Sequence, residues 1–490
     1  MITLEQAKEL GRGYGVVPVS EEMLADVKTP IEVLRILKGI SRHCYLLESV
    51  EAQKQWGRYT FLGYDPTMEI TGMNGRVSVR KKGAAEEVTV YENTHPGKII
   101  FEILLEYRSP KIEGFPPFTG GLVGYFSYDY TKYGEPGLRL KARDEEGFKD
   151  VDLMLFDKVI AYDNLRQKIR IIVNLKTQKL EEEYEAAREA IKAIKELILK
   201  GQPAEEKRGR LTSDIRSLFS ETEYSEMVKK AKHYIQEGDI FQVVLSNRLE
   251  ADFEGSLLDT YRMLRTMNPS PYLFYFSGDD LEVAGASPET LVKLENGILH
   301  TFPLAGTRPR GRNEAEDKRL EEELLEDEKE LAEHNMLVDL GRNDLGKISK
   351  FGTVEVESYL LVQRYSHVMH LGSAVRGEIR EDKTALDAIS AVLPAGTLSG
   401  APKFRAMEII DELENNKRGI YGGAIGYLDF TGNMDVCIAI RIAYKKNGKV
   451  FVRSGAGIVA DSVPEKEYQE CINKAKAVLN ALKSKEGEEG

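Results

Sequence analysis

Short segments in which apolar or β-branched residues alternate with polar ones dominate residues 44–91. Five such segments cover 44–48, 59–62, 68–71, 76–80 and 87–91, and Gly, Asp-Pro and Asn-Gly signals separate them. Alternation with a period of two is typical of strands, and these separators are typical of turns. The pattern predicts an antiparallel sheet in this part of the chain.

Helical patterns flank that sheet and return after residue 220. Helices are expected near residues 3–11, 30–40, 99–107, 179–200, 224–237, 257–267 and 401–413, with strands between them. Residues 201–220 lose both periodicities and mix Gly, Pro and charged residues, which indicates a boundary. We therefore expect one domain over residues 1–205, a connection over 206–221, a second domain over 222–484 and a disordered tail over 485–490.

Composition restricts the class of protein. The chain has 490 residues and a formal net charge of -12, which argues against a nucleic-acid binder. Cys44, Cys437 and Cys471 are odd in number and widely spaced, so no disulfide framework is expected. There is no signal-peptide pattern and no run of about 18 apolar residues, so we expect a cytoplasmic protein with no membrane partner.

A helix is expected to begin near residue 462. Ser462 followed by Glu465 is a capping-box pattern, and Pro464 suits the first helical turn. Glu467 and Glu470, three residues apart, then project from one face. Taken alone, such a face is usually a solvated, ion-paired surface.

A second acidic pair changes that interpretation. Glu330 and Glu333 also stand three apart, on a segment that turns apolar where the acids end. Two helices would each bring carboxylates to a common point, and Mg²⁺ usually takes one or two carboxylates together with water and oxygens of an anionic substrate. No Cys or His cluster in the sequence has the spacing of a zinc or iron site. The two pairs therefore predict a Mg²⁺ site.

Arginine and glycine offer a candidate anion site. Residues 434–444 alternate as one strand, with Arg441 on the same face as Cys437 and Ala439. An arginine between small side chains can reach a carboxylate with both branches of its guanidinium, although a structural ion pair is an equal alternative. Gly455 and Gly457 follow at the end of the next strand, where they allow close approach of an anion or simply form a hairpin turn.

His370 and Glu289 are the candidates for proton transfer. The two histidines of the expected strand 365–371 point to opposite faces, so only one can face a site, and a structural role is the commoner one. Glu289 stands at a strand-to-loop junction where its pKa could be raised, but turn chemistry favours the same residue type. No Ser-His-Asp order, nucleophilic Cys motif or Schiff-base context is evident.

Several longer motifs together resemble a known family. They include Leu-Leu-Glu-Ser at 46–49, Pro-Leu-Ala-Gly-Thr-Arg-Pro-Arg-Gly at 303–311, and the segments 333–344, 398–403, 420–426 and 454–459. With these motifs, nearly the whole chain resembles component I of anthranilate synthase, within the chorismate-utilizing enzymes. The resemblance implies an α/β (α+β) fold of two intertwined domains, whose antiparallel β-sheets form a sandwich flanked by helices, with the active site between them.

The resemblance also implies a ligand set. Glu333 and Glu470 would bind Mg²⁺, which holds the ring carboxylate of chorismate, and Glu330 and Glu467 would support its waters. The residues expected around the substrate, chiefly around its enolpyruvyl carboxylate, are Arg441, Tyr421, Gly455, Ala456, Gly457 and Gln242.

The same resemblance implies catalytic roles. Glu289 would act as general acid on the departing 4-hydroxyl while ammonia adds at C2, and His370 would assist the elimination of pyruvate. Thr307 and Lys474 would line the site. Residues 222–484 are therefore expected to form the chorismate-binding catalytic domain.

Two positions separate this activity from related ones. Aminodeoxychorismate synthases commonly carry a nucleophilic lysine where this chain has Ala305, and isochorismate and salicylate synthases use a lysine where it has Gln242. Neither side chain can attack chorismate or activate water, which leaves room for ammonia. Because some aminodeoxychorismate synthases lack that lysine, their activity stays an alternative.

The resemblance further implies partners. A separate glutamine amidotransferase subunit would supply ammonia, in a heterotetramer of two large and two small subunits. Tryptophan would inhibit the enzyme at a site in the N-terminal domain and its neighbour, formed by Leu47, Glu48, Ser49, Asn268, Pro269, Ser270, Pro271 and Tyr272. After Ser49 the sequence departs from the better-known bacterial versions.

Two alternatives belong to other classes. An inactive, tryptophan-sensing regulatory protein predicts the loss of a metal carboxylate or of the arginine, and neither is missing from the sequence. An acidic scaffold with solvated helix faces predicts no response to metal.

Overall fold

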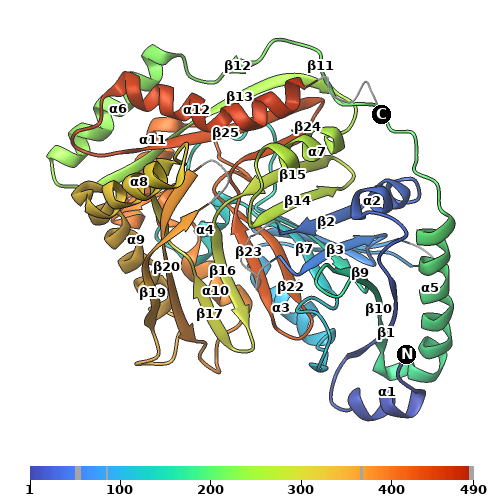
Figure 1. Cartoon of the computed structure of the whole chain (residues 1–490). Coiled ribbons are helices and arrows are strands. Elements are labelled where there is room, and N and C mark those ends of the chain that lie inside the picture. Colours follow the sequence, from blue (N-terminus) through green and yellow to red (C-terminus); the bar gives the residue numbers. More distant parts are fainter. Residues whose placement is uncertain (50–56, 84–85, 365–367, 485–490) are drawn as a thin grey trace.

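Two antiparallel β-sheets packed face to face, with helices outside them, make up the protein in a computed structural model (Figure 1). The structure describes residues 1–49, 57–83, 86–364 and 368–484. The expected tail at 485–490, the segment that follows Ser49, and the start of the expected strand 365–371 lie outside the described residues. The predicted sandwich of antiparallel sheets flanked by helices is confirmed.

The larger sheet has 13 strands within the described residues. Its order is β1 (Val16–Leu24), β10 (Lys168–Lys176), β9 (Lys158–Asp163), β3 (Tyr59–Tyr64), β2 (Cys44–Glu48), β14 (Tyr272–Ser277), β15 (Leu281–Ser287), β24 (Ile442–Lys446), β25 (Lys449–Ile458), β13 (Gln242–Glu254) and β11 (Arg210–Leu211). Two short strands, β12 (Arg216–Ser217) and β21 (Gly400–Ala401), also pair with β13.

The second sheet has 12 strands in the same part of the chain. Its order is β18 (Leu304–Pro309), β20 (Val368–Glu378), β17 (Ile298–Thr301), β16 (Thr290–Glu295), β23 (Met434–Ile438), β22 (Ala424–Asp429), β7 (Gly121–Phe126), β8 (Val151–Phe156), β4 (Met68–Met73), β5 (Arg76–Lys81) and β6 (Glu87–Tyr91), and β19 (Glu355–Arg364) pairs with β20.

Both halves of the chain contribute to both sheets. In the larger sheet β2 pairs with β14, where Leu47 faces Phe274, and in the second sheet β7 pairs with β22, where Gly124 faces Gly426. The two halves are therefore intertwined rather than merely adjacent. The expected connection at 206–221 contains β11 and β12, which add to the edge strand β13. The division into domains near residues 205 and 222 stays a prediction.

Helices cover the outer faces of the sandwich. They are α1 (Leu4–Leu10), α2 (Pro30–Lys38), α3 (Pro96–Glu106), α4 (Thr131–Gly134), α5 (Leu180–Lys200), α6 (Glu221–Gln236), α7 (Leu258–Met267), α8 (Glu314–Glu326), α9 (Glu328–Gly346), α10 (Ala385–Val392), α11 (Lys403–Glu414) and α12 (Pro464–Lys483). Short 3₁₀ turns are η1 (Tyr128–Tyr130), η2 (Thr177–Lys179) and η3 (Gly396–Leu398). Figure 1 shows α6 and α12 together over β13 and β25, and α5 along β10. No helix of the described ranges combines the length and apolar character needed to cross a membrane.

The start of α12 corrects one expectation. The helix begins at Pro464 with Val463 as its N-cap, and no side chain caps it. Ser462 precedes this N-cap by one residue, so it does not form a capping box with Glu465. Its hydroxyl instead accepts a hydrogen bond from the N–H of Val459 at 3.1 Å. The predicted position of the helix is right, and the predicted cap is wrong.

The chain crosses from one sheet to the other at two places that matter for the site. Pro288 and Glu289 connect β15 of the larger sheet to β16 of the second, and residues 439–441 connect β23 of the second sheet to β24 of the larger one. The N–H of Ile438 donates to the carbonyl of Glu289 at 3.0 Å, and the N–H of Ala286 donates to the carbonyl of Arg441 at 3.2 Å. These bonds hold the two crossovers side by side.

The second crossover also corrects the expectation of a single strand over 434–444. Arg441 has a φ of 55°, in the left-handed region, so the strand is broken there. Cys437 packs in the core between the sheets, and so does Ile442, although the two residues stand five positions apart. In a regular strand, residues an odd number of positions apart point to opposite faces, so the kink reverses which side chains point to the core between the sheets. Ile438 accordingly packs in a different core from Ile442.

Candidate active site

A cavity of about 1040 Å³ lies where the two crossovers meet α9, α12 and the edge of β25. The predicted site residues that line it are Gln242, Glu289, Thr307, Glu330, Glu333, His370, Tyr421, Arg441, Gly455, Gly457, Glu467, Glu470 and Lys474. Ala456 is different, because its side chain is fully buried on the other face of β25 and packs with residues of α6 and α11. Positions spread over more than 200 residues of sequence thus converge on one space.

One wall of the cavity is acidic. Glu330 and Glu333 stand on α9, and Glu467 and Glu470 stand on α12, as the spacing of the two pairs predicts. Desolvation and then repulsion by Glu330 raise the pKa of Glu333, and Glu470 adds to this effect. Desolvation also raises the pKa of Glu467, and repulsion by Glu470 contributes. Glu470 also pairs with Lys474 at 2.7 Å, but the oxygen donors that these four side chains offer are all carboxylates, which fit a hard divalent cation such as Mg²⁺.

The opposite wall is basic. Arg441 is half-buried, and burial lowers the pKa of its guanidinium. Throughout the described ranges, no carboxylate forms an ion pair with Arg441, so the structural ion pair considered from the sequence is excluded there. The buried Tyr421 acts in the opposite direction and raises the pKa of Arg441, but its effect is smaller than that of burial. A guanidinium held in this way is suited to an anionic ligand.

Gly455 and Gly457 lie within β25 rather than in a hairpin turn. They face Ser246 and Val244 of β13, whose N–H groups donate away from β25, to Glu414 and to Ser399. In an antiparallel pair the facing glycines must then also direct their N–H groups away from β13, toward the cavity. A Cβ at Gly455 would lie 3.0 Å from Oη of Tyr421, and one at Gly457 would lie 2.7 Å from Nε2 of Gln242. A Cβ at Gly455 would also lie 2.8 Å from the carbonyl oxygen of Leu245, so glycine is needed there for this close approach.

Glu289 lies between the two walls. Its Oε1 accepts a hydrogen bond from the hydroxyl of Thr397 at 3.0 Å. Burial raises the pKa of Glu289 to about 7, against the opposing effects of Thr397 and Lys474. The carboxyl is therefore protonated in a large fraction of molecules at neutral pH and can donate a proton to a ligand.

His370 is held on β20 opposite Thr307 of β18. Its Nδ1 lies 3.0 Å from the carbonyl oxygen of Gly306 and 3.0 Å from the hydroxyl of Thr307. Burial lowers the pKa of His370, which favours the neutral ring. An N–H on Nδ1 that donates to Gly306 makes Nε2 the basic nitrogen. The other histidine of the expected strand, His367, lies outside the described residues.

Comparison with known proteins decides the family. Residues 42–480 match the model of a family described as chorismate binding enzyme. The chain belongs to this family. It is 48% identical over 491 residues to anthranilate synthase component 1 of Acetivibrio thermocellus, with 98% of each chain covered. It is also 48% identical over 490 residues to anthranilate synthase component 1 of Aquifex aeolicus, which covers 98% of this chain and 97% of the relative.

A solved structure agrees with the sequence relatives. Anthranilate synthase component I from Streptococcus pneumoniae TIGR4 superposes with a TM-score of 0.77 at 38% identity, over 94% of this chain and 99% of that one. The family resemblance inferred from the motifs is confirmed, and the protein is an enzyme of the chorismate-binding family.

The two positions expected to separate this activity from related ones both lie at the cavity. Ala305 and Gln242 are among its lining residues, and neither is a lysine. The lysines that line the cavity, Lys329, Lys466 and Lys474, stand on α9 and α12 instead. Lys474 donates to the carbonyl of Gly455 at 3.1 Å.

The predicted tryptophan segment is brought together by strand pairing, since Glu48 of β2 faces Leu273 of β14. Glu48 already accepts hydrogen bonds from Oη of Tyr261 at 2.6 Å and from Nε of Arg265 at 2.8 Å. The hydroxyl of Ser49 is buried without a hydrogen-bond partner in the described part of the chain. Among the described residues, the hydroxyl of Ser49 therefore has unused hydrogen-bonding capacity.

The remaining residues of that segment divide between two environments. Leu47 and Tyr272 pack against the core between the sheets, and the hydroxyl of Tyr272 donates to Asp435 at 2.8 Å. Those that line the large cavity are Asn268, Pro269, Ser270 and Pro271. Tryptophan binding at this segment stays a prediction.

Thr397 was missed by sequence reasoning. It lies in η3 and reaches Glu289 across 108 positions of sequence. A threonine in a 3₁₀ turn carries no periodic signal, and the only nearby indication is the family motif that begins at residue 398. The hydrogen bond to Glu289 makes Thr397 part of the candidate site.

A group of possible metal ligands also appears that the sequence did not indicate. Ligand atoms of His43, Glu69 and Asp279 lie within 4.8 Å of one another. Arg80 pairs with Glu69 and, at 2.6 Å, with Asp279, so a cation already occupies the space between the carboxylates. This group is an ion-pair cluster between strands of the two sheets.

Proposed function

We propose that the chain is the large subunit, component 1, of an anthranilate synthase, which converts chorismate and ammonia to anthranilate, pyruvate and water, the first committed step of tryptophan biosynthesis. The observation that carries the proposal is the cavity, in which Arg441 has no carboxylate partner among the described residues and faces two pairs of carboxylates. Chorismate has two carboxylates, one for each wall. The named relatives support ammonia as the nucleophile, and so do Ala305 and Gln242, which stand at the cavity where a lysine would otherwise act.

The acidic wall would hold Mg²⁺. Glu333 and Glu470 would be its ligands, and Glu330 and Glu467 would accept hydrogen bonds from its waters. When bound, the ion supplies a positive charge that neutralises the ring carboxylate of chorismate and offsets the repulsion among the four glutamates.

The basic wall would hold the enolpyruvyl carboxylate. Arg441 donates to it, Tyr421 contributes its hydroxyl, and the N–H groups of Gly455 and Gly457 complete the set. Ala456 acts from the other face of β25, where its packing fixes the strand. With both carboxylates fixed, the ring lies against Glu289 and His370 in one orientation.

Glu289 performs the first proton transfer. Its carboxyl gives a proton to the 4-hydroxyl, the C4–O bond breaks, and water leaves. The lone pair of ammonia forms the C2–N bond as both ring double bonds shift by one position toward C4, and the new ammonium then releases a proton. The pKa of about 7 lets Glu289 serve as the acid at neutral pH.

His370 acts in the second step. The proton on C2 is removed, the C3–O bond breaks, and the ring becomes aromatic, while the departing enolpyruvyl group takes a proton on its methylene carbon to become pyruvate. The basic Nε2 of His370 is the group that we assign to this elimination. Thr307 keeps the imidazole in place, and Lys474 keeps Gly455 in place.

Component 1 implies a second component, and we propose a glutamine amidotransferase subunit that releases ammonia, two of each subunit forming a heterotetramer in the cytoplasm. Tryptophan would inhibit the enzyme through the segment around Ser49 and Asn268. The buried hydroxyl of Ser49 without a partner in the described chain supports a ligand there.

The test is an assay of the purified chain with chorismate, Mg²⁺ and an ammonium salt. We expect the fluorescence of anthranilate to appear, to vanish with a chelator and to be absent in the variant Glu470→Ala. Glu465→Ala is the matched control, because Glu465 is an exposed carboxylate of the same helix away from the cavity lining.

Chromatography of the products separates the alternatives. Aminodeoxychorismate or isochorismate in place of anthranilate would show that Ala305 and Gln242 do not determine the nucleophile as proposed. If chorismate were not consumed under any of these conditions, the regulatory alternative would replace the enzyme.

A further inference from the structure

Three charged side chains form a cluster next to the basic wall, and one of them, Arg453, is also among the residues that line the cavity. Glu414, the last residue of α11, pairs with Arg418 at 2.5 Å and with Arg453 of β25 at 2.7 Å. Each of the three is 2% exposed or less. Buried charges are costly unless hydrogen bonds satisfy them, and here both oxygens of Glu414 and both guanidinium groups have partners.

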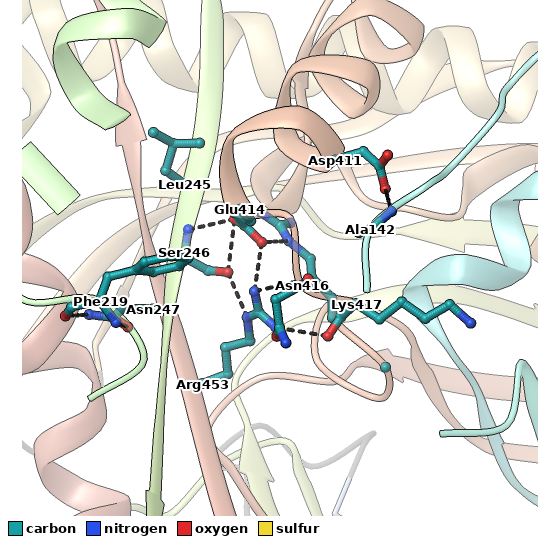
Figure 2. A network of polar contacts seen from close by, with 12 residues as sticks. Ala142, Phe219, Leu245, Ser246, Asn247, Asp411, Glu414, Asn416, Lys417 and Arg453 are labelled. Carbon is teal, nitrogen blue, oxygen red and sulfur yellow. Dashed lines mark hydrogen bonds and ion pairs between the residues drawn. The ribbon is translucent and has the colours of Figure 1, made fainter. Parts of the chain in front are cut away.

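Arg453 ties two strands to the loop that carries Tyr421 (Figure 2). Its Nε donates to the hydroxyl of Ser246 on β13 at 2.8 Å. Its Nη1 donates to Oδ1 of Asn416 at 2.9 Å and to the carbonyl of Lys417 at 3.0 Å. Figure 2 shows Glu414, Ser246 and Asn416 gathered around this one guanidinium.

Arg418 ties the same loop to two other segments. Its Nη1 donates to the carbonyl of Leu398 in η3 at 2.6 Å, and its Nη2 donates to the carbonyl of Val244 in β13 at 2.7 Å. The guanidinium also lies over the rings of Tyr128, at 4.7 Å, and Tyr421, at 5.8 Å. The cluster thus joins β13, β25, η3 and the loop that follows α11.

Each of the four joined segments presents residues to the cavity. Gln242 stands on β13, Gly455 and Gly457 on β25, Thr397 in η3, and Tyr421 in the loop. We propose that Glu414, Arg418 and Arg453 are positioning residues that set the relative places of these groups around the enolpyruvyl carboxylate. Two guanidinium groups against one carboxylate also leave one positive charge next to this part of the cavity, which favours an anion.

Arg248 shows what a purely structural arginine looks like in the same sheet. It is also buried, on β13, where it pairs with Glu250 at 2.7 Å and lies over the ring of Phe451 at 5.2 Å. Neither partner lines the cavity. Arg248 faces Arg453 across the β13–β25 pair, so the variant Arg248→Met removes a neighbouring buried guanidinium while the hydrogen bonds of Arg453 to Ser246 and Asn416 stay in place.

The experiment compares Arg453→Met with Arg248→Met in the full chain with Mg²⁺ and ammonium. For Arg453→Met we expect the KM for chorismate to rise about 10-fold to 100-fold with a smaller change in kcat, because displaced groups no longer converge on one carboxylate. For Arg248→Met we expect the KM to stay within about twofold of the wild type. Thermal unfolding shows that both variants are folded at the assay temperature.

Asn416→Ala keeps the inference testable if Arg453→Met does not fold. It removes one acceptor of Arg453 and leaves all three charges in place. We expect a rise in KM of about threefold, since one hydrogen bond of the loop is lost. A folded Arg453→Met variant with the KM of the wild type would overturn the inference. If Arg453→Met does not fold, a wild-type KM in Asn416→Ala would overturn it.

The inference rests on the proposed function only for the identity of the ligand. Calorimetric titration of the protein with chorismate in the presence of Mg²⁺ distinguishes a failure of the inference from a failure of the proposed function. A wild-type chain that neither binds nor converts chorismate would contradict the proposed function. If a folded Arg453→Met variant bound chorismate as tightly as the wild type, only the positioning role would be contradicted.

Discussion

The two walls of the cavity are built in different ways and hold opposite charges. Helices α9 and α12 form the acidic wall, on which desolvation and mutual repulsion raise the pKa of Glu333. A kinked crossover and the edge of β25 form the basic wall, on which burial lowers the pKa of Arg441. Both shifts disfavour the charged form of the free protein. The comparison teaches that each wall is completed by a ligand of opposite charge, a cation on one side and an anion on the other.

Removal of the group between the walls should have the largest effect. We expect Glu289→Gln to lower kcat by about 10²-fold to 10⁴-fold, because the amide cannot give a proton to the leaving hydroxyl. Both walls stay intact, so the KM for chorismate and the requirement for Mg²⁺ should be unchanged in steady-state assays. A large rise in KM with little change in kcat would mean that Glu289 binds rather than protonates.

A break in the basic wall should affect binding. We expect Arg441→Gln to raise the KM for chorismate by about 10-fold to 100-fold, because a charge-assisted hydrogen bond contributes roughly 1.5–3 kcal/mol. The concentration of Mg²⁺ needed for half-maximal rate should not change. A parallel loss of Mg²⁺ affinity would show that the two walls do not act separately.

A weaker acidic wall should give the converse result. We expect Glu330→Gln to reduce the apparent affinity for Mg²⁺ about 10-fold, because this carboxylate would orient metal-bound water. Saturating Mg²⁺ should restore the rate, as measured by a titration of the metal at fixed chorismate. Glu465→Gln serves as the control on the other acidic helix, and an effect of equal size there would argue for general surface charge.

The pH dependence of kcat tests the role of Glu289 as the acid between the two walls. A general acid must be protonated, so kcat should fall as pH rises through about 7. Thr397 lowers the pKa of Glu289 through its hydrogen bond, and Thr397→Val should therefore raise that pKa and move the descending limb to higher pH. Profiles of kcat for the two proteins check this, and a shift to lower pH would contradict it.

The smallest effect concerns a region outside both walls. We expect Ser49→Ala to weaken inhibition by tryptophan by about fivefold, because one buried hydrogen bond to the ligand is lost. The values of kcat and KM without tryptophan should not change. Inhibition curves at fixed chorismate measure this, and an unchanged curve would remove Ser49 from the tryptophan segment.

The acidic wall was predictable from the sequence, and the reason is local. Glu330 and Glu333, like Glu467 and Glu470, are related by the helical repeat, which a one-dimensional pattern reports directly. The strands at 44–91 were predictable for a similar reason, because alternation and turn residues act between near neighbours. What the pattern could not supply is the meeting of α9 and α12, which rests on packing across the whole chain.

For the basic wall, the sequence predicts which residues take part but not the backbone geometry that places them. Alternation over 434–444 suggested one strand, and nothing in that pattern shows that Arg441 adopts a left-handed conformation where the chain changes sheets. Gly455 and Gly457 were noted for their permissive backbone, but their role inside a strand depends on the donors of β13. Thr397 and the cluster around Glu414 act through contacts between distant segments, which local patterns do not record.

The most direct test is a crystal structure of the inactive variant Glu289→Gln with chorismate and Mg²⁺. The account predicts the metal on Glu333 and Glu470 beside the ring carboxylate, and the enolpyruvyl carboxylate on Arg441 and the N–H groups of Gly455 and Gly457. Chorismate bound with its enolpyruvyl carboxylate at the metal, or bound outside this cavity, would contradict the assignment of the two walls.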